Sequence, residues 1–150
     1  MSSDIVVEVQ RVLDAIDLPS DEQLKVWVDA GVDQKYSGYE MVIRIVDETE
    51  SASLNDRYRH KSGATNVLSF TADIPEGVDL PLLGDLVICA PVVAQEAKEQ
   101  MKGLSAHWAH MVVHGALHLQ GYDHQDEEEA QVMELIEREV LEGLGFADPY

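Results

Sequence analysis

Three histidines at fixed spacing in the C-terminal third of the sequence have the chemistry to share a metal ion. His114 and His118 are four residues apart, which on a helix places both imidazoles on one face, one turn apart. Gly121 comes three residues later and can adopt the positive φ that ends a helix and turns the chain back. His124 follows after three more residues, where the returning loop can deliver a third imidazole. The spacing therefore predicts one metal site built by His114, His118 and His124.

Three imidazole ligands are typical of a catalytic zinc site, because they leave the fourth tetrahedral position open for water. Nickel, copper and iron also accept such ligands. The spacing is that of the metzincin proteases, which place their general base, a glutamate, directly after the first histidine. Gly115 occupies that position here. Asp85 and Asp123 are candidate replacements, either as the base or as carboxylates that orient a ligand. A metallopeptidase-like hydrolase with a relocated base is therefore an alternative.

Two more histidines precede the trio in the same segment. His110 and His114 are also four residues apart, so the spacing alone leaves other ligand sets open. We favour the set that uses the glycine turn. His107 and His110 are then expected in the core or beside the ligands.

The sequence contains one basic cluster in a strongly acidic chain. Asp and Glu total 29 against 10 Lys and Arg, which gives a formal net charge of −19. Arg57, Arg59 and Lys61 lie in a segment, 57–72, that contains no acidic residue. Such a patch can hold a phosphate locally while the acidic body repels polyanions at long range. The alternative is a solvated loop whose cations pair with nearby acids.

The pattern of apolar and turn residues predicts an α+β fold. We expect a small mixed sheet of about four strands packed with helices, the histidine-bearing helix being central. Ser20 and Gln23 form a capping-box pattern, and Ser105 is a candidate cap for the histidine helix. Trp27 and Trp108 are expected in the core. The predicted strands are 4–9, 41–46, 66–70 and 83–89, and the predicted helices are 20–30, 47–55, 91–102, 105–121 and 126–145.

Length and composition predict one domain spanning residues 1–150, since 150 residues is an ordinary size for a single domain. Cys89 is the only cysteine, which excludes an intramolecular disulfide and favours a reducing compartment. Residues 103–122 carry no Lys, Arg, Asp or Glu, but their four histidines argue against a membrane span. We therefore expect a soluble, cytoplasmic protein without membrane contact.

Three separated blocks of the sequence resemble the YbeY family, the zinc-dependent endoribonucleases of bacterial ribosomal RNA maturation. The blocks run from about residue 40 to the C-terminal part of the sequence, and the histidine block is the most specific of them. Where that family usually has Asp, Pro and Pro, this sequence has Ser62, Ala64 and Thr71, which bears on the rigidity of the basic loop. The matching blocks are His114–His124 (HGALHLQGYDH), 54–61 (LNDRYRHK) with 65–70 (TNVLSF), and 83–89 (LGDLVIC).

The resemblance implies a metal-dependent endoribonuclease that binds one zinc ion per chain through His114, His118 and His124. It implies that Arg59 is the functionally important arginine, which would stabilise charge on the phosphate during cleavage. Lys61 is a further candidate phosphate contact. The implied partners are single-stranded RNA and the small ribosomal subunit with its proteins, in rRNA processing and ribosome quality control. A non-catalytic ribosome assembly factor with a structural zinc is the remaining alternative.

Overall fold

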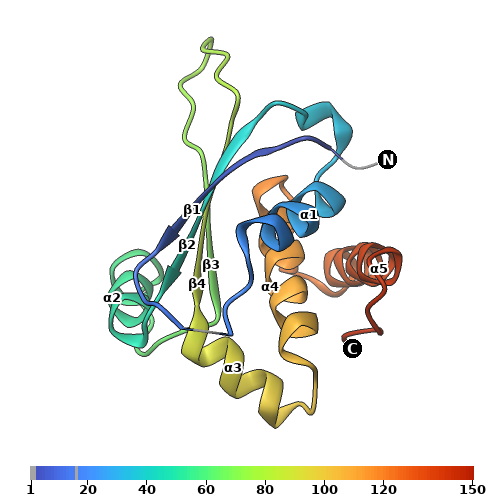
Figure 1. Ribbon diagram of the computed structural model, residues 1–150. Helices are drawn as coiled ribbons and strands as arrows, with labels where there is room; N and C mark the ends of the chain where they lie inside the picture. The colour runs from blue at the N-terminus through green and yellow to red at the C-terminus, as the bar shows by residue number, and fades with distance from the viewer. Residues whose placement is uncertain (1–2, 16) are drawn as a thin grey trace.

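The computed structural model describes residues 3–15 and 17–150, which form a four-stranded mixed sheet with helices on both faces (Figure 1). The strand order is β1-β2-β4-β3, in which β1, β2 and β4 are parallel and β3 is antiparallel to β4. This confirms the predicted α+β class. The strands are β1 (Val6–Arg11), β2 (Glu40–Val46), β3 (Val67–Thr71) and β4 (Leu82–Cys89).

The helices lie on opposite sides of this sheet. On one side α4 packs against β3 and β4, and α1, α3 and α5 surround it, so the histidine helix is central as predicted (Figure 1). On the other side α2 covers one end of the sheet. The α-helices are α1 (Asp21–Gly31), α2 (Glu48–Arg59), α3 (Ala90–Glu99), α4 (Leu104–Leu119) and α5 (Glu127–Gly143), and a short 3-10 helix spans Gln34–Tyr36.

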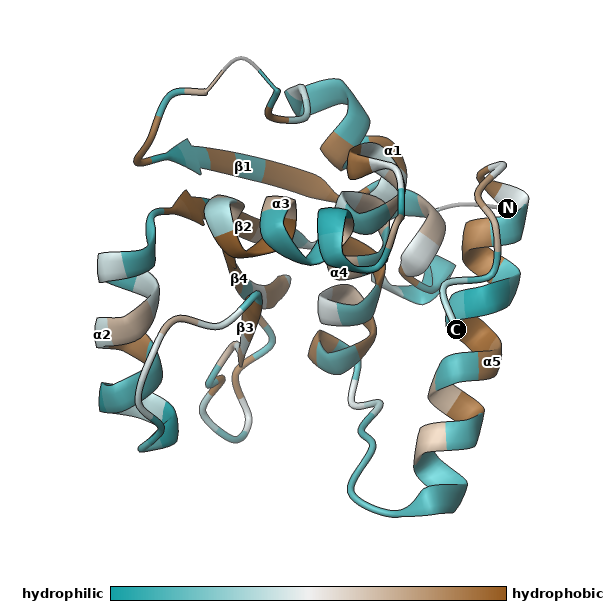
Figure 2. Ribbon diagram, turned by 90° about the horizontal axis from the view of Figure 1, so that it is seen from below, coloured by the Kyte–Doolittle hydropathy of each residue, from teal (hydrophilic) through white to brown (hydrophobic). Residues whose placement is uncertain are grey.

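Alternation along the strands divides the sheet into two unlike faces. Met41, Ile43 and Ile45 of β2 point toward α4 and are fully or almost fully buried, as β-branched and long apolar side chains at every second position should be. Trp27 and Trp108 join this core, as predicted. In Figure 2 the strands are mostly hydrophobic, whereas α2 is mostly hydrophilic. The central helix α4 is thereby fixed against a buried sheet face.

Helix ends follow local chemistry, but several differ from the sequence prediction. The helix predicted over 47–55 continues to Arg59, where His60 ends it in the left-handed conformation (φ 55°). The Ser20–Gln23 capping box forms as predicted. The helix predicted to run to residue 102 stops earlier, at Glu99, because Met101 adopts the left-handed conformation (φ 54°) usually taken by glycine. Ser105 is not a cap: α4 begins at Leu104 after Gly103, with no side-chain cap.

None of the helices in the described part of the chain is long and apolar enough to cross a bilayer.

Candidate metal centre

The end of α4 positions the predicted ligands. The N–H of Gly121 donates to the His118 carbonyl (3.0 Å) and the N–H of Tyr122 donates to the Leu117 carbonyl (3.1 Å), with Gly121 at φ 96°. These two bonds form a Schellman motif, which ends the helix and reverses the chain. The reversal brings His124 back beside the last turn of α4, as the sequence predicted.

The three predicted ligands converge in space. The imidazole centroids of His114 and His118 are 4.7 Å apart, and that of His124 lies 5.7 Å from the first and 5.0 Å from the second. One ring nitrogen of each lies within 4.8 Å of the others. Because zinc–nitrogen bonds are about 2.0–2.1 Å long, nitrogens around one ion lie about 3–3.5 Å apart. Small side-chain rotations therefore suffice to bind a metal.

The hydrogen bonds of the ligands decide which ring nitrogen faces the site. The Nδ1 of His118 lies 2.9 Å from the Tyr122 carbonyl, and the Nδ1 of His114 lies 2.5 Å from a carboxylate oxygen of Glu137. Both oxygens accept, so in each neutral ring Nδ1 carries the hydrogen and Nε2 carries the lone pair. The two Nε2 atoms face each other at 3.2 Å. Two lone pairs at that distance repel unless a cation lies between them, so the donor set fits a divalent metal.

The electrostatic environment favours the ligand form of His118. Burial lowers the pKa of this imidazole, and the neighbouring His114 and His124 lower it further. A lower pKa keeps the ring neutral at pH 7, and only a neutral ring offers a lone pair to a metal.

The basic segment lines the same cleft as the histidines. This cleft has a volume of about 840 Å³ and is lined by Arg59 and Lys61 as well as by the three histidines. Arg59 ends α2, donates from Nη2 to the Ser69 carbonyl of β3 (2.6 Å), and lies over the Phe70 ring at 5.2 Å. The structure thus brings together the basic cluster and the histidine cluster, although Arg59 and His114 are 55 residues apart in the sequence. Arg57 is near Tyr58 and does not line the cleft.

Two buried polar side chains of α2 hold the basic loop. The Ser51 hydroxyl bonds both the carbonyl and the N–H of Thr65, each at 3.0 Å, and the Asn55 amide donates to the Gly63 carbonyl at 2.9 Å. These bonds hold the loop in which Ser62 and Ala64 stand where the family usually has Asp and Pro. Ser51 and Asn55 were not predicted from the sequence, because their role depends on loop residues 14 and eight positions further along the chain.

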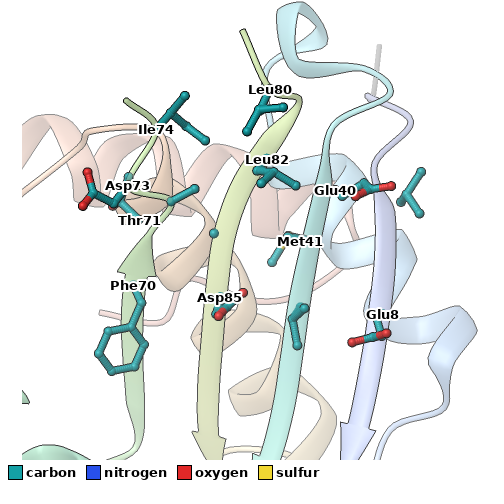
Figure 3. Close-up of a pocket in the computed structure, with 14 residues that line it drawn as sticks. Glu8, Glu40, Met41, Phe70, Thr71, Asp73, Ile74, Leu80, Leu82 and Asp85 are labelled. Carbon is teal, nitrogen blue, oxygen red and sulfur yellow. The ribbon is translucent and has the colours of Figure 1, made fainter. Parts of the chain in front are cut away.

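The two predicted carboxylates lie in different places. Asp123 lines the histidine cleft and accepts the backbone N–H of His124 at 2.8 Å, with its carboxylate 4.0 Å from the His124 ring. Asp85 lies on the sheet face away from α4, in a second cavity of about 690 Å³ with Glu8 and Phe70 (Figure 3). Burial, and to a lesser extent Glu8, raises the pKa of Asp85. The structure therefore brings Asp123, and not Asp85, to the candidate metal centre.

The comparisons with known proteins agree with this geometry. The family model for Endoribonuclease YbeY matches residues 10–145. The chain belongs to the YbeY family. Relatives named Endoribonuclease YbeY include those of Pseudomonas syringae pv. syringae, 58% identical over 88% of this chain and 80% of the relative, and Pseudomonas putida, 56% identical over 96% and 92%. Membership of the YbeY family supports an endoribonuclease. The solution structure of TM1509 from Thermotoga maritima shares the fold, with a TM-score of 0.59 and 24% identity over 97% of both chains.

In this YbeY-family chain Gly115 cannot be replaced by the glutamate of the zinc proteases without rearrangement. A Cβ at Gly115 would lie 2.7 Å from the Leu86 Cδ2, because the residue faces β4 and not the cleft. Leu86 is fully buried. The position therefore has no room for a carboxylate, which argues against a protease-like mechanism.

The remaining histidines lie behind the ligands, as the sequence analysis expected of groups outside the ligand set. His107 is buried and lies 2.9 Å from a carboxylate oxygen of Glu96, while His110 lies 3.6 Å from one of Glu137. Glu137, which is fully buried, was not predicted from the sequence to belong to the site. The available signal was its spacing, four residues from both Met133 and Leu141 on the buried side of α5.

Proposed function

We propose that the protein is a zinc-dependent endoribonuclease that cuts single-stranded RNA, formed by a single domain spanning residues 1–150. The observation that carries the proposal is the cleft in which the Nε2 atoms of His114 and His118 lie 3.2 Å apart and which Arg59 and Lys61 also line. Membership of the YbeY family supports the same activity.

The metal would be held by His114, His118 and His124, one ion per chain. When bound, zinc supplies a Lewis acid for a phosphoryl oxygen and lowers the pKa of water to about 7. The residues of the chain prepare this site: the Tyr122 carbonyl and the Glu137 carboxylate orient two of the imidazoles. Asp123 accepts the backbone N–H of His124 and would thereby hold the loop that carries the third imidazole; its carboxylate would also accept a proton within the cleft.

Arg59 would bind the phosphate that is cut. Its guanidinium has five N–H donors, and the bond to the Ser69 carbonyl uses one of them. The remaining donors suit the non-bridging oxygens of a phosphate, on which negative charge grows in the transition state. Lys61 adds a second cation at the same wall. Both cations lie in an otherwise acidic molecule, so phosphate binding is confined to the cleft.

A single strand is the substrate that fits this cleft best. Single-stranded RNA can splay its bases and pass a phosphate into a local cleft, whereas a duplex presents a rigid backbone. The net charge of −19 opposes general attraction to RNA. We therefore propose that the protein reaches its substrate, small-subunit ribosomal RNA, by docking on basic ribosomal proteins. A single cysteine is consistent with action in the cytoplasm.

The decisive experiment measures cleavage of a fluorescently labelled single-stranded RNA and its duplex form, with and without a chelator. We expect cutting of the single strand alone, lost on chelation and restored by zinc. Arg59→Ala should lower the rate about 100-fold, as removal of a charge-stabilising donor usually does. Arg57→Ala is the matched control, since it removes the same charge from the same turn outside the cleft.

Two results would reject this function. Cutting that survives both chelation and His118→Ala would show that the activity comes from elsewhere, such as a contaminating nuclease. Absence of cutting by zinc-loaded protein that binds small ribosomal subunits would favour the assembly-factor alternative.

A further inference from the structure

We propose that Glu137 and Tyr150 form a positioning pair that fixes the orientation of His114 and thereby sets the affinity of the three-histidine site for zinc. The inference rests on the proposed metal site, and it assigns a role to two residues that lie outside the cleft and outside the ligand set.

The pair contacts His114 on the side away from the metal site. One carboxylate oxygen of Glu137 accepts from the His114 Nδ1 at 2.5 Å, and the other accepts from the Tyr150 hydroxyl. Glu137 is 0% exposed. A buried carboxylate is stable only when its oxygens are bonded, and these two bonds satisfy both. The carboxylate is therefore held in one position against His114.

His110 completes the arrangement. Its Nε2 lies 3.3 Å from the Tyr150 oxygen, and its Nδ1 has no hydrogen-bond partner among the described residues. A hydrogen on that buried Nδ1 would be left unbonded, so the neutral ring carries its hydrogen on Nε2 and donates it to Tyr150. Tyr150 then has its own hydrogen directed to Glu137. The bonds that link His110, Tyr150, Glu137 and His114 then have one consistent set of donors and acceptors.

The segment that carries Tyr150 is itself fixed to α5. Arg138 pairs with Asp148 at 3.1 Å, and its guanidinium lies over the Tyr150 ring at 5.3 Å. The backbone N–H of Tyr150 donates to Asp148 at 2.9 Å. Residues 138 to 150 therefore deliver the hydroxyl to a defined point, although the Tyr150 residue as a whole is half exposed.

As a consequence, the His114 ring already has the tautomer and orientation that metal binding requires in the metal-free protein. A carboxylate accepts the Nδ1 hydrogen of His114, which leaves the lone pair on Nε2, facing His118 and the cleft. Carboxylates bonded to metal-binding histidines raise ligand basicity, and their loss typically lowers metal affinity by 10- to 100-fold. Without Tyr150 the carboxylate keeps its charge but loses the bond that holds its second oxygen.

The test is a zinc titration of the full-length protein against a chromophoric chelator. Glu137→Gln should weaken zinc binding by about 10- to 100-fold, and Tyr150→Phe by about tenfold. Glu134→Gln is the matched control. Glu134 and Glu137 line one small cavity of about 240 Å³, but Glu134 makes no hydrogen bond to a histidine among the described residues, so this variant removes the same charge without the bond. We expect this variant to bind zinc as the unaltered protein does.

A second measurement separates positioning from a role in folding. In the metal-free protein at pH 7.5, nitrogen NMR of the His114 ring should report one tautomer, with the hydrogen on Nδ1, and a mixture of tautomers in Glu137→Gln. Melting of each metal-free variant shows whether it is folded. A purely structural pair would lower the melting temperature and leave the zinc affinity of the folded protein unchanged, which would overturn the proposal.

The outcomes distinguish this inference from the proposed function. If the unaltered protein binds no zinc, the metal site itself is wrong. If it binds zinc and Tyr150→Phe binds zinc equally well, the proposed metal site is retained and the proposed positioning role of Glu137 and Tyr150 is rejected. Because Tyr150→Phe only removes a hydroxyl from a half-exposed residue, this arm remains informative even if Glu137→Gln does not fold.

Discussion

Substitution of Gly115 by alanine tests how closely α4 is packed against the sheet. The new Cβ would lie 2.7 Å from Cδ2 and 3.1 Å from Cδ1 of Leu86. Alanine is favoured over glycine inside a helix by about 1 kcal/mol. Added atoms in a packed core usually cost about 1–3 kcal/mol. Leu86 is fully buried and cannot move freely, so we expect a net loss of unfolding free energy of up to about 2 kcal/mol.

Urea denaturation of the metal-free protein measures this loss. The control is Gly143→Ala at the end of α5, where an added Cβ meets no described residue within 4 Å apart from its chain neighbours and the backbone of its own helix. That variant should keep its unfolding free energy or gain up to about 1 kcal/mol. Replacing glycine by alanine should thus lower the unfolding free energy at position 115 and keep or raise it at position 143. The difference between the two variants measures the contact with Leu86.

A double-mutant cycle identifies the contact. Leu86→Ala alone should cost about 2–5 kcal/mol, and it should cost at least about 1 kcal/mol less when Gly115→Ala is already present, because the smaller side chain removes the clash. Additive effects, or a Gly115→Ala variant as stable as Gly143→Ala, would refute the reasoning that α4 needs glycine at this position.

Three further outcomes are expected. Ser20→Ala removes the α1 capping bond to Gln23 and should lower the unfolding free energy by about 1 kcal/mol, measured in urea. Burial raises the pKa of Glu137, but hydrogen bonds from its neighbours lower it to about 2, against the ordinary 4.5. The ionised Glu137 therefore adds about 3 kcal/mol to the unfolding free energy above pH 4.5, and this stabilisation is lost as the pH falls toward 2. In acid unfolding, the unfolding free energy of Glu137→Gln should fall less over that range than that of the unaltered protein. Zinc at 100 times its dissociation constant should raise the unfolding free energy by about 2.7 kcal/mol, seen as a higher melting temperature that is absent in His118→Ala; an equal rise in that variant would contradict the ligand assignment.

Local patterns predicted much of the fold. Every strand and α-helix of the described residues had a counterpart in the sequence prediction, because alternation, capping residues and prolines act within a few positions. The short 3-10 helix Gln34–Tyr36 was not predicted. The exceptions are also local. Met101 takes the left-handed conformation expected of glycine, so a pattern that looks for glycine placed the end of α3 too late. The start of α4 has no side-chain cap for a pattern to detect.

The histidine cluster proposed to bind the metal was predictable for the same reason, whereas the groups that contact it were not. His114, His118 and His124 lie within a stretch of eleven consecutive residues, and one helix with one glycine turn brings them together. Glu137 belongs to another helix, and in a sequence rich in glutamates nothing but its spacing marks it as buried. The position of Asp85 depends on which face of the sheet its side chain points to. The strand pattern alone did not decide between the two faces.

The bond between Arg59 and β3 bears on the solubility of the protein. In the described sheet β3 is the last strand, and it pairs only with β4. An unpaired strand edge invites another chain to add to it, and natural proteins guard such edges with charge. The Arg59 guanidinium bonds the Ser69 carbonyl on β3 and places a cation there. Loss of this side chain would leave the edge free for intermolecular strand pairing, so Arg59→Ala preparations should show more self-association by light scattering than Arg57→Ala preparations.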